Sequence, residues 1–307
     1  MQIITSLEKM SLPEKSAVAI GKFDGIHMGH RQLLSEIIAK KREGLKAVVF
    51  TFHPSPNVLF SKKLERELTS LEEKRQVFEG LGVDILVEFP MTYETAATPK
   101  EVFVKDILVE KINAKFIVAG CDLSFGKNGE GNSEFLIGEG QKFGFDVKII
   151  DKISYKDEII SSTLVRQAIA DGDVKKAKFM LGSPYFIKGV VEKGNQIGRT
   201  IGFPTVNVTP PKEKLLPPNG VYKTEVTVDG RIYEAITNIG CKPTVTDEGK
   251  IGVESYIYNF TENIYGKEIE VAFLEFMRKE KKFENVDELK KQLQSDMQMG
   301  QKINTED

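Results

Sequence analysis

The sequence predicts an α/β protein in two parts: a doubly wound parallel sheet, then an antiparallel β-structure with a closing helix. In the first part, short apolar runs of strand length alternate with segments of helical periodicity, as in parallel sheets covered by helices on both faces. In the second part, consecutive strand-like runs joined by short turns favour an antiparallel sheet. The 307 residues, 40% hydrophobic and 29% charged, suffice for two domains with packed cores.

Composition and charge narrow the class of function. The formal net charge of -2 lacks the basic excess typical of nucleic-acid-binding proteins, so small phosphorylated molecules are better candidates for the ligand. Cys121 and Cys241 show no zinc-site or disulfide spacing, which fits a reducing compartment. Residues 1–15 lack a signal-peptide core, and no apolar run reaches the roughly 18 residues of a membrane span. We expect a cytoplasmic protein without a nucleic-acid or membrane partner, and a weak homo-oligomer is compatible with the sequence.

The first part contains five expected strands, at residues 17–20, 46–52, 84–89, 115–120 and 145–151. Helices are expected after the first strand, after the capping residues Thr69 and Ser70, and near Pro99, where a missing N–H costs little. Because ligands bind beyond the carboxyl ends of parallel strands, the segments that follow these strands should meet at one edge. These segments are residues 21–30, 52–56 (FHPSP, with His53) and 120–126 (GCDLSFG).

The stretch GKFDGIHMGH, residues 21–30, is a strand-to-helix turn. Gly21, Gly25 and Gly29 let a ligand approach the backbone, and the first N–H groups of the following helix favour an anion. His27 and His30 add neutral or charged donors, so phosphate is the ligand that would use the whole turn. The alternative is a pair of ordinary surface histidines beside a Gly-rich loop. All three histidines of the chain lie in its first 53 residues, next to predicted strand ends, which favours the functional interpretation.

A second helix start, ISSTLVR at residues 160–166, carries Ser161, Ser162, Thr163 and Arg166. Plain capping with a solvated arginine would explain these residues. Hydroxyls, free N–H groups and a guanidinium at one helix start also make a phosphate clamp. Two such clamps in one domain indicate a triphosphate.

The boundary between the parts is expected near Gly182, which gives domains of residues 1–182 and 183–307. Strands of the second part are expected at residues 186–191, 221–228, 231–238, 253–260 and 268–276. Asp229 and Gly230 are a strong hairpin-turn signal between two of them. The pattern indicates an antiparallel barrel or sandwich. The closing helix carries apolar residues at helical spacing: Val286, Leu289 and Leu293.

The second part has its own candidate site in GRTIGFPTVNV, residues 198–208. Its glycines allow close backbone approach, its proline stiffens the loop, and its threonine and asparagine offer oxygen ligands that suit Mg²⁺ beside a nucleotide phosphate. The residues concerned are Gly198, Gly202, Pro204, Thr205 and Asn207. Glu254, in a strand-like run, could accept a proton from a substrate hydroxyl in a partly dry site. A glycine-proline turn and a strand glutamate facing solvent would explain the same residues.

GKFDGIHMGH resembles the GxFDGxHxGH turn of the nucleotidylyltransferase superfamily, and ISSTLVR is similar to its ISSTxxR element. The resemblance covers roughly residues 16–182. It implies that a phosphate oxygen attacks the α-phosphorus of ATP in line and that pyrophosphate leaves, with His27 and His30 stabilising charge on the α-phosphoryl oxygens. The residues implied in ATP binding are Gly21, Phe23, Asp24, Gly25, His27, His30, Ser161, Ser162, Thr163 and Arg166. Catalysis would rest on positioning and electrostatics, with Mg²⁺ supplying additional charge.

GRTIGFPTVN resembles the GxxxGxPTxN signature of riboflavin kinases, and VESYIYNF (residues 253–260) falls where that family places its catalytic glutamate. NIGCKPT (residues 238–244) and residues 265–283 are similar to further segments of the family. The order of the two parts matches the bacterial bifunctional riboflavin kinase/FAD synthetase family over nearly the whole chain. This resemblance implies a nucleotidylyltransferase domain followed by a riboflavin kinase β-barrel.

The resemblance also implies roles in two consecutive ATP-dependent steps. Glu254 would deprotonate the ribityl 5′-hydroxyl of riboflavin as the γ-phosphate of ATP arrives, with Thr205 and Asn207 on Mg²⁺ and phosphate. The product, FMN, would attack a second ATP in the first domain and give FAD.

Three flavin contacts follow from the same resemblance. Asp122 lies in a loop implied to line the flavin site of the first domain, and Phe125 either lines that site or belongs to the core. Arg278 would touch the flavin of the kinase site or only cover the barrel.

The sequence departs from the family pattern at a few positions. Tyr256 and Asn259 stand where a histidine and an aspartate are common, and Gly129 stands where a basic residue is frequent. His53 lies two residues before the usual histidine position. These changes leave Glu254 in place but alter neighbouring pocket contacts.

Two other functions fit parts of the sequence. The first domain could adenylylate another phosphorylated small molecule, with the barrel serving only as a binding module. Alternatively, the chain could be a non-catalytic flavin or nucleotide sensor, although the intact clamps and the glutamate base disfavour this function.

Overall fold

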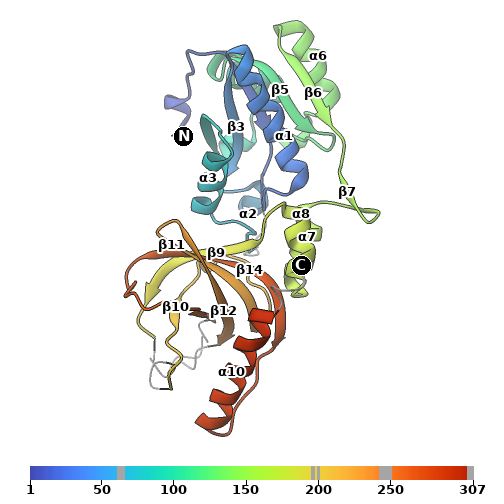
Figure 1. Cartoon of the computed structure of the whole chain (residues 1–307). Helices are drawn as coiled ribbons and strands as arrows, with labels where there is room; N and C mark the ends of the chain where they lie inside the picture. The colour runs from blue at the N-terminus through green and yellow to red at the C-terminus, as the bar shows by residue number, and fades with distance from the viewer. Residues whose placement is uncertain (61–65, 195–197, 199–200, 242–250, 303–307) are drawn as a thin grey trace. The chain divides into compact units, whose positions relative to one another are not determined.

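The computed structural model describes residues 1–307 except 61–65, 195–197, 199–200, 242–250 and 303–307 (Figure 1). The chain forms two compact units, residues 1–162 and 163–307. Parts of two expected motifs, residues 199–200 and 242–244, therefore lie outside the described residues.

The division between the units falls after the first residue of α7 (Ser162–Ala170), so the rest of α7 and all of α8 (Val174–Leu181) belong to the same unit as the barrel. Lys175 on α8 forms an ion pair of 2.7 Å with Glu275 of the barrel. The boundary at residue 182 stays a prediction for the limits of the two catalytic domains.

The first unit contains a six-stranded parallel sheet with the order β1-β4-β3-β2-β5-β6. Its strands are β1 (Gln2–Ile4), β2 (Ser16–Ile20), β3 (Lys46–His53), β4 (Ile85–Pro90), β5 (Ala114–Gly120) and β6 (Asp146–Ile150). The chain runs from β2 to one side through β3 and β4, and returns to the other side through β5. The ends of β2 and β5 therefore form a topological switch point, where doubly wound sheets bind ligands.

Helices cover both faces of this sheet, as predicted. Alternate residues of β2 divide between two cores, because successive strand side chains point to opposite faces. Ala17 and Ala19 pack with Leu34 of α1 and Phe78 of α3, whereas Val18 and Ile20 pack with the opposite core. The helices of the unit are α1 (Met28–Ala39), α2 (Pro56–Phe60), α3 (Leu71–Gly80), α4 (Tyr93–Ala96), α5 (Lys100–Val102) and α6 (Ser133–Phe143).

Local sequence signals set several helix ends. Ser70 and Glu73 form a capping box at the start of α3, with hydrogen bonds of 3.2 and 2.8 Å. Pro99 caps α5, which continues as a π-helical segment, Phe103–Lys111. The sequence did not predict the short elements β1, α2 and α4, nor the hairpin of β7 (Ser154–Tyr155) and β8 (Glu158–Ile159).

The second unit is a closed antiparallel barrel with the order β10-β13-β12-β11-β14-β9. Its strands are β9 (Tyr185–Glu192), β10 (Val206–Val208), β11 (Gly220–Val228), β12 (Arg231–Cys241), β13 (Ile251–Ile257) and β14 (Glu268–Lys279). Asp229 and Gly230 form the predicted two-residue turn with φ of 48° and 78°, because a type I′ hairpin needs both residues in the left-handed region. Of the two architectures that the sequence left open, the barrel is therefore the correct one and the sandwich is not.

The predicted closing helix is α10 (Val286–Lys302). Met297 of α10 packs against the barrel residues Val221, Ile236 and Tyr258. Arg278 of β14 holds the helix through two hydrogen bonds to Asp296, of 2.9 and 2.6 Å.

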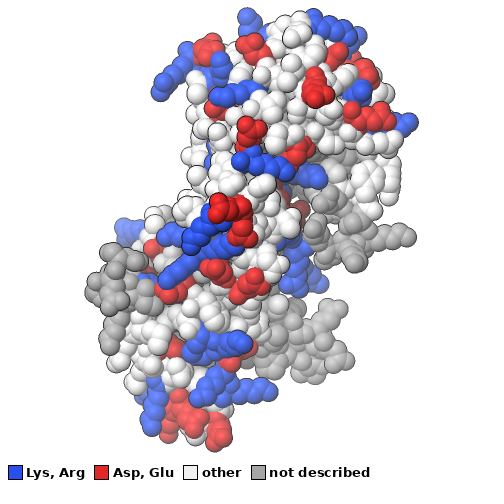
Figure 2. Space-filling view, turned by 90° about the vertical axis from the view of Figure 1, so that its right-hand side faces the viewer, with Lys and Arg blue, Asp and Glu red and all other residues white. Residues whose placement is uncertain are grey.

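The charged surface has no dominant sign on the face that Figure 2 shows. Lys and Arg side chains are interspersed there with Asp and Glu, in keeping with the formal net charge of -2. Among the described residues, no helix combines the length and the apolar character that a membrane crossing requires.

Candidate active sites

The histidine turn connects the end of β2 to the start of α1, at the switch point of the parallel sheet. His27 occupies the N-cap position of α1, and its carbonyl oxygen accepts a 2.9 Å hydrogen bond from the Arg31 N–H. The rings of His27 and His30 stack, with centroids 3.8 Å apart and planes 20° from parallel. A Cβ on Gly29 would lie 3.2 Å from the His27 ring, so glycine leaves room for the stack. The turn thus presents two adjacent imidazoles at a helix N-terminus, which favours an anion.

Both imidazoles are neutral near pH 7. Burial lowers the pKa of His27 from 6.5 to about 4, although the carboxylates of Asp24 and Asp122 oppose this shift. The pKa of His30 lies well below its ordinary value because of burial first, and then because of His27 and the ammonium of Lys74. The Nδ1 atoms of both rings are buried without a hydrogen-bond partner. Buried polar atoms are normally paired, so these nitrogens are candidates for ligand contact.

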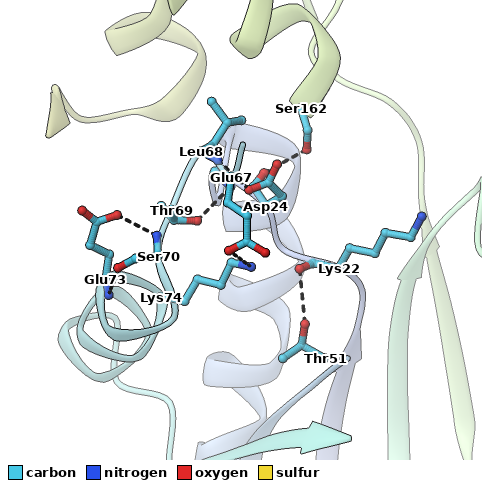
Figure 3. Close-up of polar contacts among 11 residues, drawn as sticks. Lys22, Asp24, Thr51, Glu67, Leu68, Thr69, Ser70, Glu73, Lys74 and Ser162 are labelled. Carbon is cyan, nitrogen blue, oxygen red and sulfur yellow. Dashed lines mark hydrogen bonds and ion pairs between the residues drawn. The ribbon is translucent and has the colours of Figure 1, made fainter. Parts of the chain in front are cut away.

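Hydrogen bonds from distant parts of the chain hold the turn in place (Figure 3). The Asp24 carboxylate accepts a 3.0 Å bond from the Leu68 N–H, and the Thr69 hydroxyl accepts a 3.2 Å bond from the Gly25 N–H. The hydroxyl of Ser162 donates a 2.8 Å bond to the Asp24 carbonyl oxygen. The structure therefore brings Ser162 of the ISSTLVR segment to the histidine turn.

The turn also contains strained backbone. Phe23 and Ile26 adopt φ of 50° and 44°, the left-handed region that bulky residues rarely occupy. Both side chains are buried in the core beneath α1, which offsets the strain. Such strain is common where a loop must hold a binding geometry.

The neutral state of His27 makes a testable prediction about pH. Between pH 6.5 and about 4 an unfolded chain binds a proton on this residue that the folded chain does not, so stability falls as the pH falls through this window. At the acidic end of this pH window the free energy of unfolding should be lower by about 3 kcal/mol. Urea unfolding of the wild type and of His27→Gln at pH 7.5 and 4.5 measures it, with a smaller loss expected for the variant. An imidazole NMR titration of His27 with a midpoint near 6.5 would contradict the prediction.

Other expected residues of the nucleotide site take different positions. Ser161 directly precedes α7, whereas Thr163 and Arg166 lie on α7 in the second unit, so their part in ATP binding stays a prediction. The exposed Asp122 forms a 3.2 Å ion pair with Lys152. Phe125 is buried in the core, where it packs on Phe103 with ring centroids 5.3 Å apart, so its position favours the core alternative.

An exposed aromatic pair near the same edge of the sheet was not predicted. Phe60 ends α2 and Tyr93 begins α4, which follow β3 and β4, and their rings meet edge to face at 6.1 Å. They are 59% and 72% exposed, so both rings are accessible to a ligand. Tyr93 stands alone between the polar residues Thr92 and Glu94, and Phe60 ends the short apolar run of Val58 and Leu59, so the sequence does not set either ring apart as a ligand contact.

The candidate site of the barrel centres on the short strand β10. Asn207 lies opposite Glu254 of β13 and, on its other side, opposite Glu192 of β9. Thr205 precedes β10 by one residue, two positions before Asn207, and is half-buried. Directly opposed residues of antiparallel strands share a face, so the register brings Asn207 next to the half-buried Glu254. Asn238 of β12 also pairs with Glu254, a neighbour that the sequence did not indicate.

Asn207 has an unsatisfied acceptor. Its side chain is only 5% exposed, and its Oδ1 atom is buried without a hydrogen-bond partner. Gly194 lets the backbone pass against the Asn207 amide, where a Cβ would collide with it. A buried amide oxygen without a partner fits a cation or a polar ligand group.

The remaining expected residues of the barrel support or flank this strand. The Gly198 carbonyl accepts a 2.8 Å hydrogen bond from the Phe203 N–H, which closes the loop, and Gly202 has a φ of 87° that favours glycine. Pro204 is exposed. Arg278 is engaged with Asp296 and the Lys279 carbonyl oxygen, so its observed contacts favour the covering role.

Comparisons with known proteins cover both units. A family model described as FAD synthetase matches residues 9–164, and one described as riboflavin kinase matches residues 181–304. The bifunctional riboflavin kinase/FMN adenylyltransferase of Listeria monocytogenes is 38% identical over 92% of this chain and 90% of its own length. The Escherichia coli K12 protein of the same name is 36% identical over 96% of each chain. A crystal structure titled as a macrolide-efflux protein from Streptococcus pneumoniae shares 32% identity and superposes with a TM-score of 0.88 over 98% of this chain and 99% of that chain.

A parallel-sheet unit that matches an FAD synthetase model and a β-barrel that matches a riboflavin kinase model define a transferase with two ATP-dependent activities. The chain belongs to the bifunctional riboflavin kinase/FMN adenylyltransferase family. It phosphorylates riboflavin to FMN and adenylylates FMN to FAD. This confirms the two-step function predicted from the sequence. It disfavours the two alternatives, an adenylyltransferase for another small molecule and a non-catalytic sensor.

Proposed function

We propose that the histidine turn carries the adenylyl transfer. The neutral imidazoles of His27 and His30 would donate hydrogen bonds to the phosphates of ATP, and the N-terminus of α1 would add its partial positive charge. Charge grows on the α-phosphoryl oxygens as the FMN phosphate attacks and pyrophosphate leaves, so fixed donors at this place lower the barrier. The stacked ring pair, with its two buried and unpaired Nδ1 atoms, is the observation that supports this assignment. The FMN phosphate is already ionised near neutral pH, so this step needs no general base.

We propose further that Ser161, Ser162, Thr163 and Arg166 hold the departing β- and γ-phosphates. The bond from the Ser162 hydroxyl to the Asp24 carbonyl supports this proposal for Ser162, because it holds that residue at the histidine turn. The exposed Phe60 and Tyr93 would offer aromatic faces to the flavin ring system of FMN, because aromatic rings stack favourably.

We propose that Glu254 is the general base of the kinase step. The carboxylate would accept the proton of the ribityl 5′-hydroxyl as this oxygen attacks the γ-phosphorus of ATP and ADP leaves. Its half-buried position opposite Asn207 supports this role, because the strand register puts the carboxylate beside the proposed metal ligand, where the substrate hydroxyl would meet the phosphate.

The residues of the barrel fit a divalent cation that is held together with nucleotide phosphates. Among the described residues, no three His, Cys, Asp or Glu side chains gather as a metal site. The unpaired Oδ1 of Asn207 and the hydroxyl of Thr205 are oxygen ligands of the kind that Mg²⁺ uses when substrate phosphates complete its shell. We propose Mg²⁺ for this position, where it would neutralise charge on the β- and γ-phosphates.

The metal proposal predicts a selective loss in one variant. Asn207→Ala removes an oxygen ligand, so riboflavin phosphorylation should fall at least about tenfold and need more Mg²⁺ to reach its maximum. Conversion of FMN to FAD by the same variant should stay within about twofold of wild type. Rates measured by chromatography over a series of Mg²⁺ concentrations test this. Asn263→Ala, at an exposed turn asparagine, is the matched control, and an unchanged Mg²⁺ dependence in Asn207→Ala would contradict the proposal.

Incubation of the protein with ATP and riboflavin, followed by chromatography, tests the paired assignments most directly. FMN should appear first and FAD later, and absence of both products would overturn them. We propose that the limits of the two catalytic domains are residues 1–182 and 183–307. We also propose that the protein acts in the cytoplasm without a nucleic-acid or membrane partner, and that any self-association is weak.

A further inference from the structure

A buried lysine lies beside the histidine turn. Lys74 is on the first turn of α3 and is only 8% exposed. Its Nζ atom is 3.9 Å from Oε2 of Glu67, which is beyond hydrogen-bond distance (Figure 3). Lysine is almost never buried unless it is paired. A loosely paired ammonium in the interior therefore calls for an explanation.

Two sets of contacts place Lys74 next to the imidazoles. The segment between Glu67 and α3 is bonded to the turn, since Leu68 and Thr69 contact Asp24 and Gly25. One helical turn after Lys74, Phe78 meets Phe23 edge to face at 5.5 Å, and Phe23 lies 5.0 Å from the His30 ring. Residues four apart share a face of a helix, so Lys74 lies on the face of α3 that packs against the turn. Its effect on the pKa of His30 agrees with this placement.

The turn carries its one full positive charge on Lys22, which is exposed, and its two imidazoles add none. Both imidazoles are neutral, and a helix N-terminus contributes only about half a charge. The phosphates of ATP carry several negative charges, and their binding in a partly dry site requires a cation. We propose that Lys74 is a phosphate-binding residue of the FMN adenylyltransferase site and that its ammonium exchanges Glu67 for a phosphate oxygen when ATP binds. This proposal rests on the assignment of ATP to the histidine turn.

Removal of the Lys74 ammonium should weaken ATP binding at the adenylyltransferase site only. In Lys74→Met, the KM for ATP in the conversion of FMN to FAD should rise about 10-fold to 100-fold, the range expected for a hydrogen bond to a charged group. The KM for ATP in riboflavin phosphorylation should not change. Lys41→Met is the matched control, because Lys41 lies in the same unit and pairs at 2.8 Å with Asp84. That variant should keep both KM values.

Removal of the competing carboxylate should have the opposite effect. Glu67→Gln releases Lys74, so the KM for ATP in FAD formation should fall about twofold to fivefold. A purely structural ion pair would instead give weaker or unchanged ATP binding in both variants. Glu67→Gln keeps the test decisive even where Lys74→Met fails to fold, as judged by circular dichroism and thermal unfolding.

The inference is overturned if folded Lys74→Met keeps the KM for ATP within about twofold of wild type, or if Glu67→Gln leaves this KM unchanged or raises it. His27→Ala separates this failure from that of the underlying site. If His27→Ala abolishes FAD formation while folded Lys74→Met has no effect, the ATP site stands and only the role of Lys74 is wrong. If His27→Ala keeps full activity, the assignment of the site itself fails.

Discussion

Replacement of Glu254 by glutamine is expected to stop the conversion of riboflavin to FMN while FMN is still converted to FAD. The amide keeps the size and the strand position of the side chain but does not accept a proton, so the rate should fall about 10²-fold to 10⁴-fold. Supplying each flavin separately with ATP and quantifying the products measures both steps in one protein. The second reaction serves as the internal control for folding.

The barrel offers a matched control for this variant. Glu192 lies opposite Asn207 on the other side of β10, but it is exposed and accepts a 2.8 Å hydrogen bond from Thr209. Glu192→Gln should therefore keep most of the kinase activity. Equal losses in Glu192→Gln and Glu254→Gln would show that general charge, and not proton transfer by Glu254, governs the step.

Loss of either stacked imidazole should impair FAD formation and spare riboflavin phosphorylation, the opposite of Glu254→Gln. His27→Ala and His30→Ala are expected to lower FAD formation from FMN about 10²-fold to 10³-fold, because each removes a fixed donor from the growing charge on the α-phosphoryl group. Riboflavin phosphorylation should remain near the wild-type rate. The same chromatographic assay, started from FMN and then from riboflavin, checks both expectations.

His53→Ala is the control for these variants, because His53 is the third histidine of the chain and is exposed at the end of β3. It should keep FAD formation within a few fold of wild type. Strong FAD formation by His27→Ala and His30→Ala would remove the catalytic role of the turn.

The sequence predicts the long elements because their burial leaves a recognisable pattern of apolar residues. The central strands of the sheet are continuous apolar runs, and β11 and β12 are joined by the Asp229–Gly230 turn. The short strand β10 carries no such signal, since three residues with a polar centre are too few to show a period. Its place between β9 and β13 depends on pairing with distant residues, which local pattern does not encode.

The same difference applies to the candidate sites. The three-residue spacing of His27 and His30 on one helix start already implies that they are neighbours, and the stacked rings agree with it. The neutral state of the rings depends on burial by segments far along the chain, such as residues 67–74. Lys74 resembles any helix-surface lysine in the sequence, and only the packing of α3 on the turn shows that it is buried.

The alignment of β10 against β13 ties the chemistry of the kinase half to a single offset between two strands. Side chains alternate along a strand, so a shift by one residue would put Val206 or Val208 opposite Glu254 and replace an oxygen ligand by a hydrocarbon. A barrel with its β-structure intact but misaligned by one step would thus be catalytically silent. An assay of riboflavin phosphorylation therefore detects whether β10 and β13 are paired in the correct register. A spectroscopic measurement of strand content does not detect this.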